Sequence, residues 1–505
     1  MGPAARSLTS SASSARSRAL ADGNVVFTMS TDGTEDNEYD FRYSTNITIN
    51  GRIFKVAIDT GSADLWISRP DDFTFNDTGI PVTNSYGVGA FTEVNGTIGF
   101  ASVQLGKYTF DNQVFNAATS VGLPGILDQG LDGLMGFDFG LTTSNIKTAI
   151  LKDGTLSTIL GQPFVSNIFD LTPSRDNFLA ISLSRTDDME GSATASFLIN
   201  EISSEYSDVV SAPSVALFPG SNANGRWSVP IDSISLDGVD IPFTPSTVPG
   251  APQGKLIALM DTGTPSVSFP ADFIDRLYAA VPGSVQVSSG NWNVPCNTTS
   301  IMSVQIGGQP FPIHPLDLSE VQPAPDGSVI CQSVPFAADG TTVFDSLFGD
   351  TILRNIYSVY NFGAASAKTP SDQASMQFLA QTDPTAAKAD VLNVRMAAIS
   401  SGAMTKFAGA AAAEAPVSSP SPSGSSSSFT DKLNNNYGPI VIGLLAANLF
   451  VVLVLAVVAL VMCVKRSRAG GATRTGRYVP VRVREEAIPP VRVGEFEHGD
   501  KPYSD

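Results

Sequence analysis

The chain has 505 residues, enough for two or three domains, and its net charge of −18 argues against nucleic acid as a partner, because phosphate binding needs a basic surface. Only 15% of its residues are charged, while 44 glycines and 33 prolines separate short runs rich in Val, Ile, Phe and Thr, which is typical of a β-rich globular body. The two histidines, His314 and His498, are too few for a histidine-rich metal site, and a Ser-His-Asp triad could use only His314.

Residues 1–24 are rich in Ser, Ala and Arg, and we expect them to form a disordered segment. They contain no apolar core of about 7–15 residues, so no signal peptide is visible there. Features farther along the chain nevertheless point to the secretory pathway. We therefore expect that the true leader is missing from this sequence or that its start is assigned wrongly.

From Val25 to Thr244, apolar positions alternate and Gly or Pro residues interrupt them, which predicts many short strands. The stretch from Tyr43 to Ile58 predicts a β-hairpin, because Asn50-Gly51 at its centre strongly favours a tight two-residue turn. Long helical periodicity is scarce in this part of the chain.

One short pattern occurs twice: Asp59-Thr60-Gly61-Ser62 and Asp261-Thr262-Gly263-Thr264 each follow an apolar run suited to a buried strand. The glycines allow backbone geometry that a side chain would obstruct, and the four hydroxyl residues can lock the loops and hydrogen-bond the acids. A single copy could be ordinary turn chemistry, since Asp and Gly are common turn residues. Two copies with matched apolar flanks argue against that explanation.

Two carboxylates held close together in an apolar setting cannot both be ionised, so they share one proton and titrate as a unit. Such a pair can activate water. The ionised partner removes a proton from the water as it attacks a carbonyl, and the protonated partner donates to the carbonyl oxygen. We therefore predict Asp59 and Asp261 as catalytic residues that need neither a metal nor another cofactor.

The two motifs resemble those of the pepsin-type aspartic proteases, and the resemblance runs from about Tyr39 to Arg395. Asp59 and Asp261 match the two catalytic aspartates of that family. Further matching segments are Tyr86-Gly87-Val88-Gly89, Trp66, Asp132-Gly133-Leu134-Met135-Gly136, Leu347-Phe348-Gly349-Asp350, Arg226-Trp227-Ser228-Val229, Ile234-Ser235-Leu236-Asp237-Gly238 and Arg354-Asn355-Ile356-Tyr357-Ser358-Val359-Tyr360.

The resemblance implies an all-β, bilobal fold in which two lobes, residues 25–225 and 226–395, are related by an approximate twofold axis. Each lobe would contribute one aspartate to a cleft that binds an extended peptide or protein substrate. Tyr86 and Gly87 would lie in a hairpin flap that closes over the substrate, and Trp66 would support the tyrosine. We also expect the protein to be a monomer.

Cys296 and Cys331 both lie in the second half of the chain, and spacing alone leaves open two reduced, buried thiols. The resemblance implies that they form the disulfide of the second lobe, which would suit an oxidising compartment. Four Asn-x-Ser/Thr sequons add candidate glycosylation sites at Asn46, Asn76, Asn95 and Asn297.

The composition of residues 396–439, which are rich in Ala, Ser and Pro, predicts a linker. The next segment, Ile440–Val464, contains no charged residue and is long enough to span a bilayer as a helix. The basic segment Lys465-Arg466-Ser467-Arg468 follows directly. In single-pass membrane proteins, basic residues that flank the spanning helix usually remain on the cytosolic side. We therefore predict a single-pass membrane protein with residues 465–505 in the cytosol. Its body would be extracellular or lumenal, at the plasma membrane or in the secretory pathway.

These observations together predict a membrane-tethered aspartic endopeptidase. The first alternative is a catalytically inactive cell-surface protein that holds peptides in the same cleft. It predicts damage to an Asp, Thr or Gly of the two motifs, and both motifs are intact. A second alternative, a membrane protein with its body in the cytosol, is suggested only by the missing leader, and glycan occupancy at any sequon would exclude it.

Overall fold

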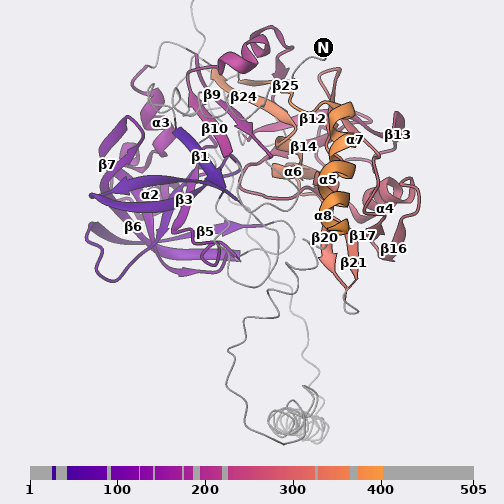
Figure 1. Ribbon diagram of the computed structural model, residues 1–505. Helices are drawn as coiled ribbons and strands as arrows, with labels where there is room; N and C mark the ends of the chain where they lie inside the picture. The colour runs from indigo at the N-terminus through magenta and orange to yellow at the C-terminus, as the bar shows by residue number, and fades with distance from the viewer. Residues whose placement is uncertain are drawn as a thin grey trace, which may run out of the picture. The chain divides into compact units, whose positions relative to one another are not determined.

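The computed structural model of the chain describes residues 25–29, 42–87, 92–123, 125–139, 143–172, 176–185, 194–218, 226–324, 328–363 and 374–401 (Figure 1). The chain divides into two compact units, Met1–Ala415 and Pro416–Asp505, and every described residue belongs to the first. The predicted segment 1–24, most of the predicted linker, the predicted spanning helix Ile440–Val464 and the tail 465–505 lie outside the described residues.

The first half of the described body is built mainly from strands. Its elements are β1 (Val25–Met29), β2 (Tyr43–Ile49), β3 (Arg52–Asp59), β4 (Leu65–Ser68), β5 (Asn76–Tyr86), β6 (Thr92–Leu105), β7 (Tyr108–Val121), β8 (Gly133–Gly136), α2 (Asn145–Asp153), η1 (Thr158–Gly161), α3 (Phe164–Phe169), β9 (Asn177–Leu183), β10 (Thr194–Ile199), η2 (Ser204–Ser211) and β11 (Val215–Ala216).

The second half is also rich in strands and ends in a helical run. Its elements are β12 (Ser228–Leu236), β13 (Val239–Ile241), β14 (Leu256–Met260), β15 (Ser268–Phe269), α4 (Ala271–Ala279), β16 (Val285–Ser288), β17 (Asn291–Val294), β18 (Met302–Ile306), β19 (Gln309–Ile313), α5 (Pro315–Leu318), β20 (Ser319–Pro323), β21 (Val329–Ser333), β22 (Phe336–Ala337), β23 (Ser346–Phe348), α6 (Asp350–Leu353), β24 (Ile356–Gly363), β25 (Ser375–Ala380), α7 (Pro384–Asp390), η3 (Val391–Met396) and α8 (Ala397–Ser400).

One large sheet joins strands from both halves. Among the described residues it contains thirteen strands in the order β11-β25-β24-β9-β10-β1-β2-β3-β8-β4-β7-β6-β5. The late strands β24 and β25 therefore complete a sheet that begins in the first half, as the orange strands beside β9 show in Figure 1. The second half adds a six-stranded sheet, β19-β18-β12-β14-β23 with β13 paired to β12, and a four-stranded sheet, β16-β17-β21-β20. The fold is mostly β, and its largest sheet crosses the lobe boundary that the sequence suggested near residue 225.

The strand pattern follows from local sequence. On β5, Ile80, Val82 and Asn84 are buried while the residues between them are exposed, as the two-residue repeat of a strand requires. On β14 all five residues are buried, which fits a strand covered on both faces. The predicted hairpin is confirmed, since β2 and β3 pair from Ile49↔Arg52 and the intervening turn has positive φ.

Each aspartate motif follows a strand that pairs in parallel with an apolar-Gly segment. Strand β3 pairs with β8, aligning Asp59 with Gly136, and β14 pairs with β23, aligning Met260 with Phe348. Glycine is required beneath both loops. A Cβ on Gly136 would lie 2.5 Å from the backbone oxygen of Ser62, and the equivalent atom on Gly349 would meet the backbone of the second loop. The same strand arrangement thus supports both motifs.

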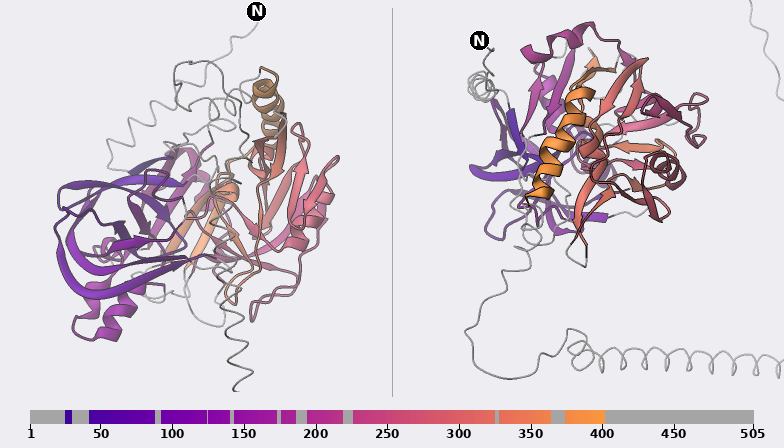
Figure 2. Two further views of the ribbon diagram at one scale, coloured as in Figure 1. Left: turned by 90° about the horizontal axis from the view of Figure 1, so that it is seen from below. Right: turned by 45° about the vertical axis from the view of Figure 1, so that its right-hand side comes forward.

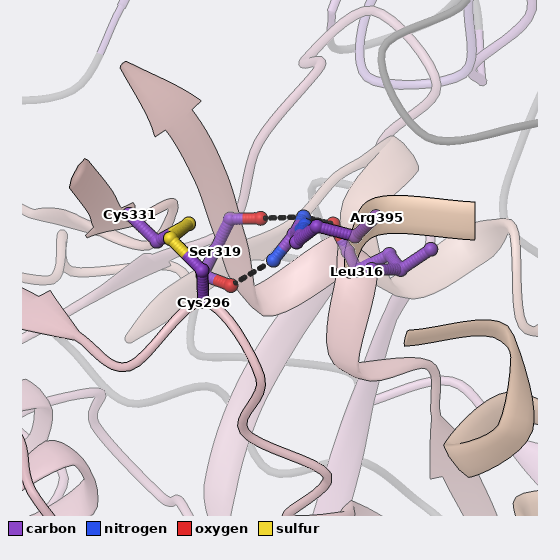
Figure 3. The surroundings of a disulfide bond; sticks show 5 residues. All are labelled: Cys296, Leu316, Ser319, Cys331 and Arg395. Carbon is purple, nitrogen blue, oxygen red and sulfur yellow. Dashed lines mark hydrogen bonds between the residues drawn. A yellow bond between two sulfur atoms is a disulfide. The ribbon is translucent and has the colours of Figure 1, made fainter. Parts of the chain in front are cut away.

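The described chain ends in a helical run formed by α7, η3 and α8, which Figures 1 and 2 show as one orange rod. The run continues past Arg395, where the sequence placed the end of the second lobe. Arg395 is buried and donates from Nη1 to Ser319 Oγ at 2.7 Å and from Nη2 to the Ser319 carbonyl at 2.6 Å, close to the disulfide in Figure 3. Across the described ranges, we find no helix with the length and apolar character needed to cross a membrane.

Buried hydrogen bonds from a charged group contribute more to stability than neutral ones, so replacing Arg395 by Ala should destabilise the body by about 2 kcal/mol or more. Thermal or urea unfolding of the two proteins would measure this. Lys388→Ala, at an exposed position of the same helical run, is the matched control and should leave stability nearly unchanged. Equal losses in the two variants would show that Arg395 does not hold the run in place.

Candidate active site

The two aspartate motifs lie at the carboxyl ends of β3 and β14. Asp59 is the last residue of β3 and Asp261 directly follows β14. Both side chains are almost completely buried, at 4% and 8% exposure for the two residues. Buried carboxylates need hydrogen bonds or charges around them, and the surrounding loops provide both.

Two threonines join the loops through crossed hydrogen bonds. Thr60 Oγ1 accepts from the Thr262 N–H at 3.0 Å and donates to the Met260 carbonyl at 2.8 Å. In the same way Thr262 Oγ1 accepts from the Thr60 N–H at 3.2 Å and donates to the Ile58 carbonyl at 3.0 Å. Each hydroxyl therefore bonds the opposite loop twice, and the four bonds follow an approximate twofold relationship.

The motif glycines bring the two carboxyl groups together. A Cβ added to Gly61 would lie 2.6 Å from Asp261 Cγ, and a Cβ added to Gly263 would lie 2.5 Å from Asp59 Oδ1. Any side chain at either position would collide with the carboxyl group of the opposite loop. The carboxyl groups of Asp59 and Asp261 therefore meet between the two glycines.

Backbone amides and hydroxyls of the loops hold both carboxyl groups in place. Asp59 Oδ1 accepts from the Gly61 N–H at 2.7 Å, and Asp59 Oδ2 accepts from the Ser62 hydroxyl. The equivalent bonds at 2.8 Å run from Gly263 N–H and Thr264 Oγ1 to the two oxygens of Asp261. Burial raises the pKa of Asp59 well above its usual range, and the charge and hydrogen bond of Asp261 raise it further. The pair is therefore suited to holding one proton.

Tyr86 lies at the end of β5, in the hairpin that β5 forms with β6. Its side chain packs against the cluster that contains the fully buried Trp66. Burial raises the pKa of Tyr86, and the negative charges of Asp59 and Asp64 raise it further, so its hydroxyl stays protonated. Gly87 follows with a positive φ of 115°. The predicted flap residue Gly89 lies outside the described residues.

The sequence interpretation missed Asp64, which is buried close to the motif. Its carboxylate accepts from Asn84 Nδ2 at 2.8 Å and from the Asn145 N–H at 2.7 Å, and it also binds the Ser144 hydroxyl. Asp64, directly before β4, thereby connects this strand to the predicted flap strand β5 and to the start of helix α2. The one sequence feature that could have pointed to Asp64 is its position as an acidic residue within the apolar run that contains Leu65.

Two arginines, whose contacts the sequence interpretation did not foresee, bind the motif glycines. Arg42 Nε donates to the Gly263 carbonyl at 3.2 Å, and Arg226 Nη1 donates to the Gly61 carbonyl at 2.7 Å. Arg42 directly precedes β2 and Arg226 lies two residues before β12, and each reaches the loop of the other repeat. A repeated Arg-aromatic-Ser sequence, at Arg42 and at Arg226, was the available signal.

A fourth buried acid lies beside this arrangement. Asp138 is fully buried; one oxygen accepts from the Phe139 N–H at 2.8 Å and the other lies 3.7 Å from Arg226 Nη1. Burial raises the pKa of Asp138 to about 7, although the charge of Arg226 partly opposes that rise. Its own N–H donates to the Ser62 carbonyl at 2.8 Å, which fixes the segment under the first loop.

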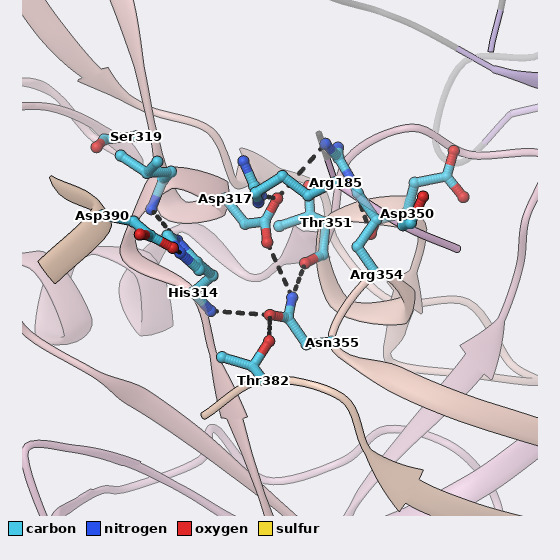
Figure 4. Close-up of polar contacts among 12 residues, drawn as sticks. Arg185, His314, Asp317, Ser319, Asp350, Thr351, Arg354, Asn355, Thr382 and Asp390 are labelled. Atoms are coloured by element: carbon cyan, nitrogen blue, oxygen red, sulfur yellow. Dashed lines mark hydrogen bonds and ion pairs between the residues drawn. The ribbon is translucent and has the colours of Figure 1, made fainter. Parts of the chain in front are cut away.

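His314 lies in a polar cluster that joins α5 to the helical run (Figure 4). Its Nδ1 accepts from the Leu316 N–H and caps helix α5, while Nε2 lies 3.4 Å from Asp390. Burial and the nearby charge of Arg185 lower its pKa to about 4. The histidine that a serine triad would have needed therefore caps a helix.

The remaining predicted residues lie elsewhere on the body. The structure contains the predicted disulfide between Cys296 and Cys331. The sequon residues Asn46, Asn76 and Asn297 are exposed and Asn95 is half-buried. In the described part of the chain, no three His, Cys, Asp or Glu side chains come together in a way that could hold a metal ion.

Comparison with known proteins identifies related sequences. The family model described as eukaryotic aspartyl protease matches residues 42–369. Aspartic-type endopeptidase ctsD of Aspergillus fumigatus is 24% identical over 371 residues, covering 70% of this chain and 71% of that protein. Pepsin A of Sus scrofa is 26% identical over 349 residues, covering 65% and 80%. Major aspartyl peptidase 1 of Cryptococcus neoformans var. grubii is 22% identical over 355 residues, covering 65% and 68%.

The raised pKa of Asp138 has a consequence for stability. The contribution of protonated Asp138 to stability is complete below the ordinary carboxyl pKa of 3.8 and is lost as pH rises through about 7. The reason is that ionising this carboxyl group costs more free energy in the folded chain than in the unfolded chain. Asp138→Asn should remove this loss, so its melting temperature should fall less than that of the native protein between acid and neutral pH.

Differential scanning calorimetry across this pH range would measure the effect, with exposed Asp240→Asn as the control. Parallel melting curves for all three proteins would mean that Asp138 does not titrate as its burial implies.

Proposed function

Since the chain belongs to the eukaryotic aspartyl protease family, we propose that Asp59 and Asp261 are the catalytic pair with which it hydrolyses peptide bonds. Family membership makes the chain an aspartic-type endopeptidase, a hydrolase. The observation that carries the residue assignment is the meeting of two buried carboxyl groups between Gly61 and Gly263. The crossed threonine bonds support it further, because they fix the two loops relative to each other.

The pair works with one shared proton. The ionised carboxylate removes a proton from a water molecule as the water oxygen attacks the carbonyl carbon of the peptide. The protonated carboxyl donates its proton to the carbonyl oxygen, which gives a tetrahedral diol. The roles then reverse, and a proton passes to the leaving amine as the C–N bond breaks.

Each loop contributes to positioning in this mechanism. The Gly61 N–H and the Ser62 hydroxyl orient Asp59, and the equivalent groups of the second loop orient Asp261. Tyr86, supported by Trp66, closes the flap over the peptide. As pH rises through the raised pKa of Asp59, the one-proton form disappears, so activity should fall.

Asp59→Asn and Asp261→Asn should each lower kcat/KM by about 10³-fold or more while the protein stays folded, because an amide cannot exchange the proton. A peptide library assayed at acid pH would measure the loss, and circular dichroism would check the fold. Exposed Asp240→Asn is the control and should retain full activity. Undiminished cleavage by either motif variant would refute the assignment, and peptide binding without cleavage by the native protein would favour the inactive binding protein.

We further propose that Ile440–Val464 tethers the enzyme to a membrane, with the body extracellular or lumenal. The charge-free run and the basic residues that follow it support this topology. The exposed sequons Asn46, Asn76 and Asn297 and the disulfide suit an oxidising secretory compartment.

The full chain should remain in the membrane pellet after alkaline carbonate extraction, whereas a chain that ends at Ala415 should be released. An enzyme that removes N-linked glycans should increase the electrophoretic mobility of the native protein, and Asn→Gln changes at the sequons should reproduce that shift. Carbonate release of the full chain would contradict the tether. An unglycosylated body open to protease on the cytosolic side would contradict the topology.

A further inference from the structure

The two arginines on the motif glycines differ in exposure. Arg42 is buried, at 7%, whereas the side chain of Arg226 is 30% exposed. Arg42 shows that an arginine bound to a motif glycine can be buried. The exposure of Arg226 therefore leaves part of this side chain open to solvent next to the catalytic pair.

Asp138 forms no hydrogen bond with Arg226. Its Oδ2 lies 3.7 Å from Arg226 Nη1, which is within ion-pair distance when Asp138 is ionised but longer than a hydrogen bond. Asp138 is also neutral in the acid range, because its pKa is raised to about 7. A guanidinium has five N–H donors, and among the described residues Arg226 uses one of them in a hydrogen bond, to the Gly61 carbonyl. Its charge is therefore available to a ligand.

The position of Arg226 determines which ligand it would meet. The Gly61 N–H binds Asp59, and the Gly61 Cα faces the Asp261 carboxyl group. A peptide bond undergoing hydrolysis must lie at this pair. In an extended peptide, successive residues are spaced by about 3.3 Å, so a cation on the Gly61 carbonyl lies beside residues next to the scissile bond. Arginine binds carboxylates strongly because its planar donors match the two oxygens.

We propose that Arg226 is a specificity-determining residue that makes this endopeptidase prefer peptides with an Asp or Glu side chain within two residues of the scissile bond. The inference rests on the proposed catalytic role of Asp59 and Asp261. The body is strongly acidic overall and would repel such peptides, so a single cation at the centre has a selective effect. Substrate carboxylates are ionised above their pKa of about 4, while Asp138 still carries its proton.

The test uses pairs of fluorogenic peptides that differ only by Glu or Gln at one position, placed in turn at the two positions before and the two positions after the cleaved bond. Activity is measured on the full chain at about pH 5, where Glu is ionised. The native enzyme should cleave the Glu peptide about 10-fold better in kcat/KM at one or more positions, the effect of one charged hydrogen bond.

The Glu/Gln ratio separates recognition from loop positioning, because a loosened loop slows both peptides equally. Arg226→Gln should reduce the ratio to about one, and Arg226→Lys should keep a preference for Glu because the positive charge remains. Arg42→Gln, which alters the matched contact on Gly263, should slow both peptides and leave the ratio unchanged. Arg226→Glu should reverse the preference, so that a Lys peptide is cleaved better than a Glu peptide.

Two outcomes would overturn the inference: equal cleavage of Glu and Gln peptides at all four positions by the native enzyme, or an unchanged ratio in Arg226→Gln. Failure of the proposed function gives a different result. The folded native enzyme would then cleave neither the Gln peptides nor the Glu peptides. Cleavage of Gln peptides that is lost in Asp261→Asn would uphold the catalytic pair whatever the ratio.

Discussion

The proposed active site depends on the crossed hydrogen bonds between Thr60 and Thr262, which join positions 202 residues apart. Both hydroxyls are buried, and each accepts from one backbone group and donates to another on the opposite side. Separating the loops would leave buried polar groups without partners, at a cost of about 1–3 kcal/mol for each group. This constraint sets the distance between the glycines and therefore between the two carboxyl groups.

The two arginines beside the loops follow the same approximate twofold symmetry as the threonine hydrogen bonds. Arg42 and Arg226 each reach across to the glycine carbonyl of the opposite repeat, so each loop is held by an arginine from the other repeat. The symmetry is not exact, because Arg226 is more exposed than Arg42 and because Asp138 lies near Arg226. A nearly symmetric scaffold thus supports an asymmetric site, as an enzyme that binds a directional peptide chain requires.

The motifs that carry the proposed chemistry and the hairpin at Asn50-Gly51 were predictable, because short-range turn geometry determines them. The thirteen-stranded sheet was not, because β24 pairs with β9 across a sequence separation that no local pattern encodes. Asp138 was missed for a different reason. The behaviour of a carboxyl group depends on its burial, and the residues around it in the sequence do not reveal that burial. Arg42 was missed because its partner is a backbone carbonyl.

The proton that we propose on Asp59 and Asp261 can be looked for directly by neutron diffraction from crystals of the deuterium-exchanged enzyme at about pH 5. Our account predicts one deuteron shared between the carboxyl groups of Asp59 and Asp261, within hydrogen-bond distance of both. Two deuterons, none, or carboxyl groups too far apart to share one would contradict it.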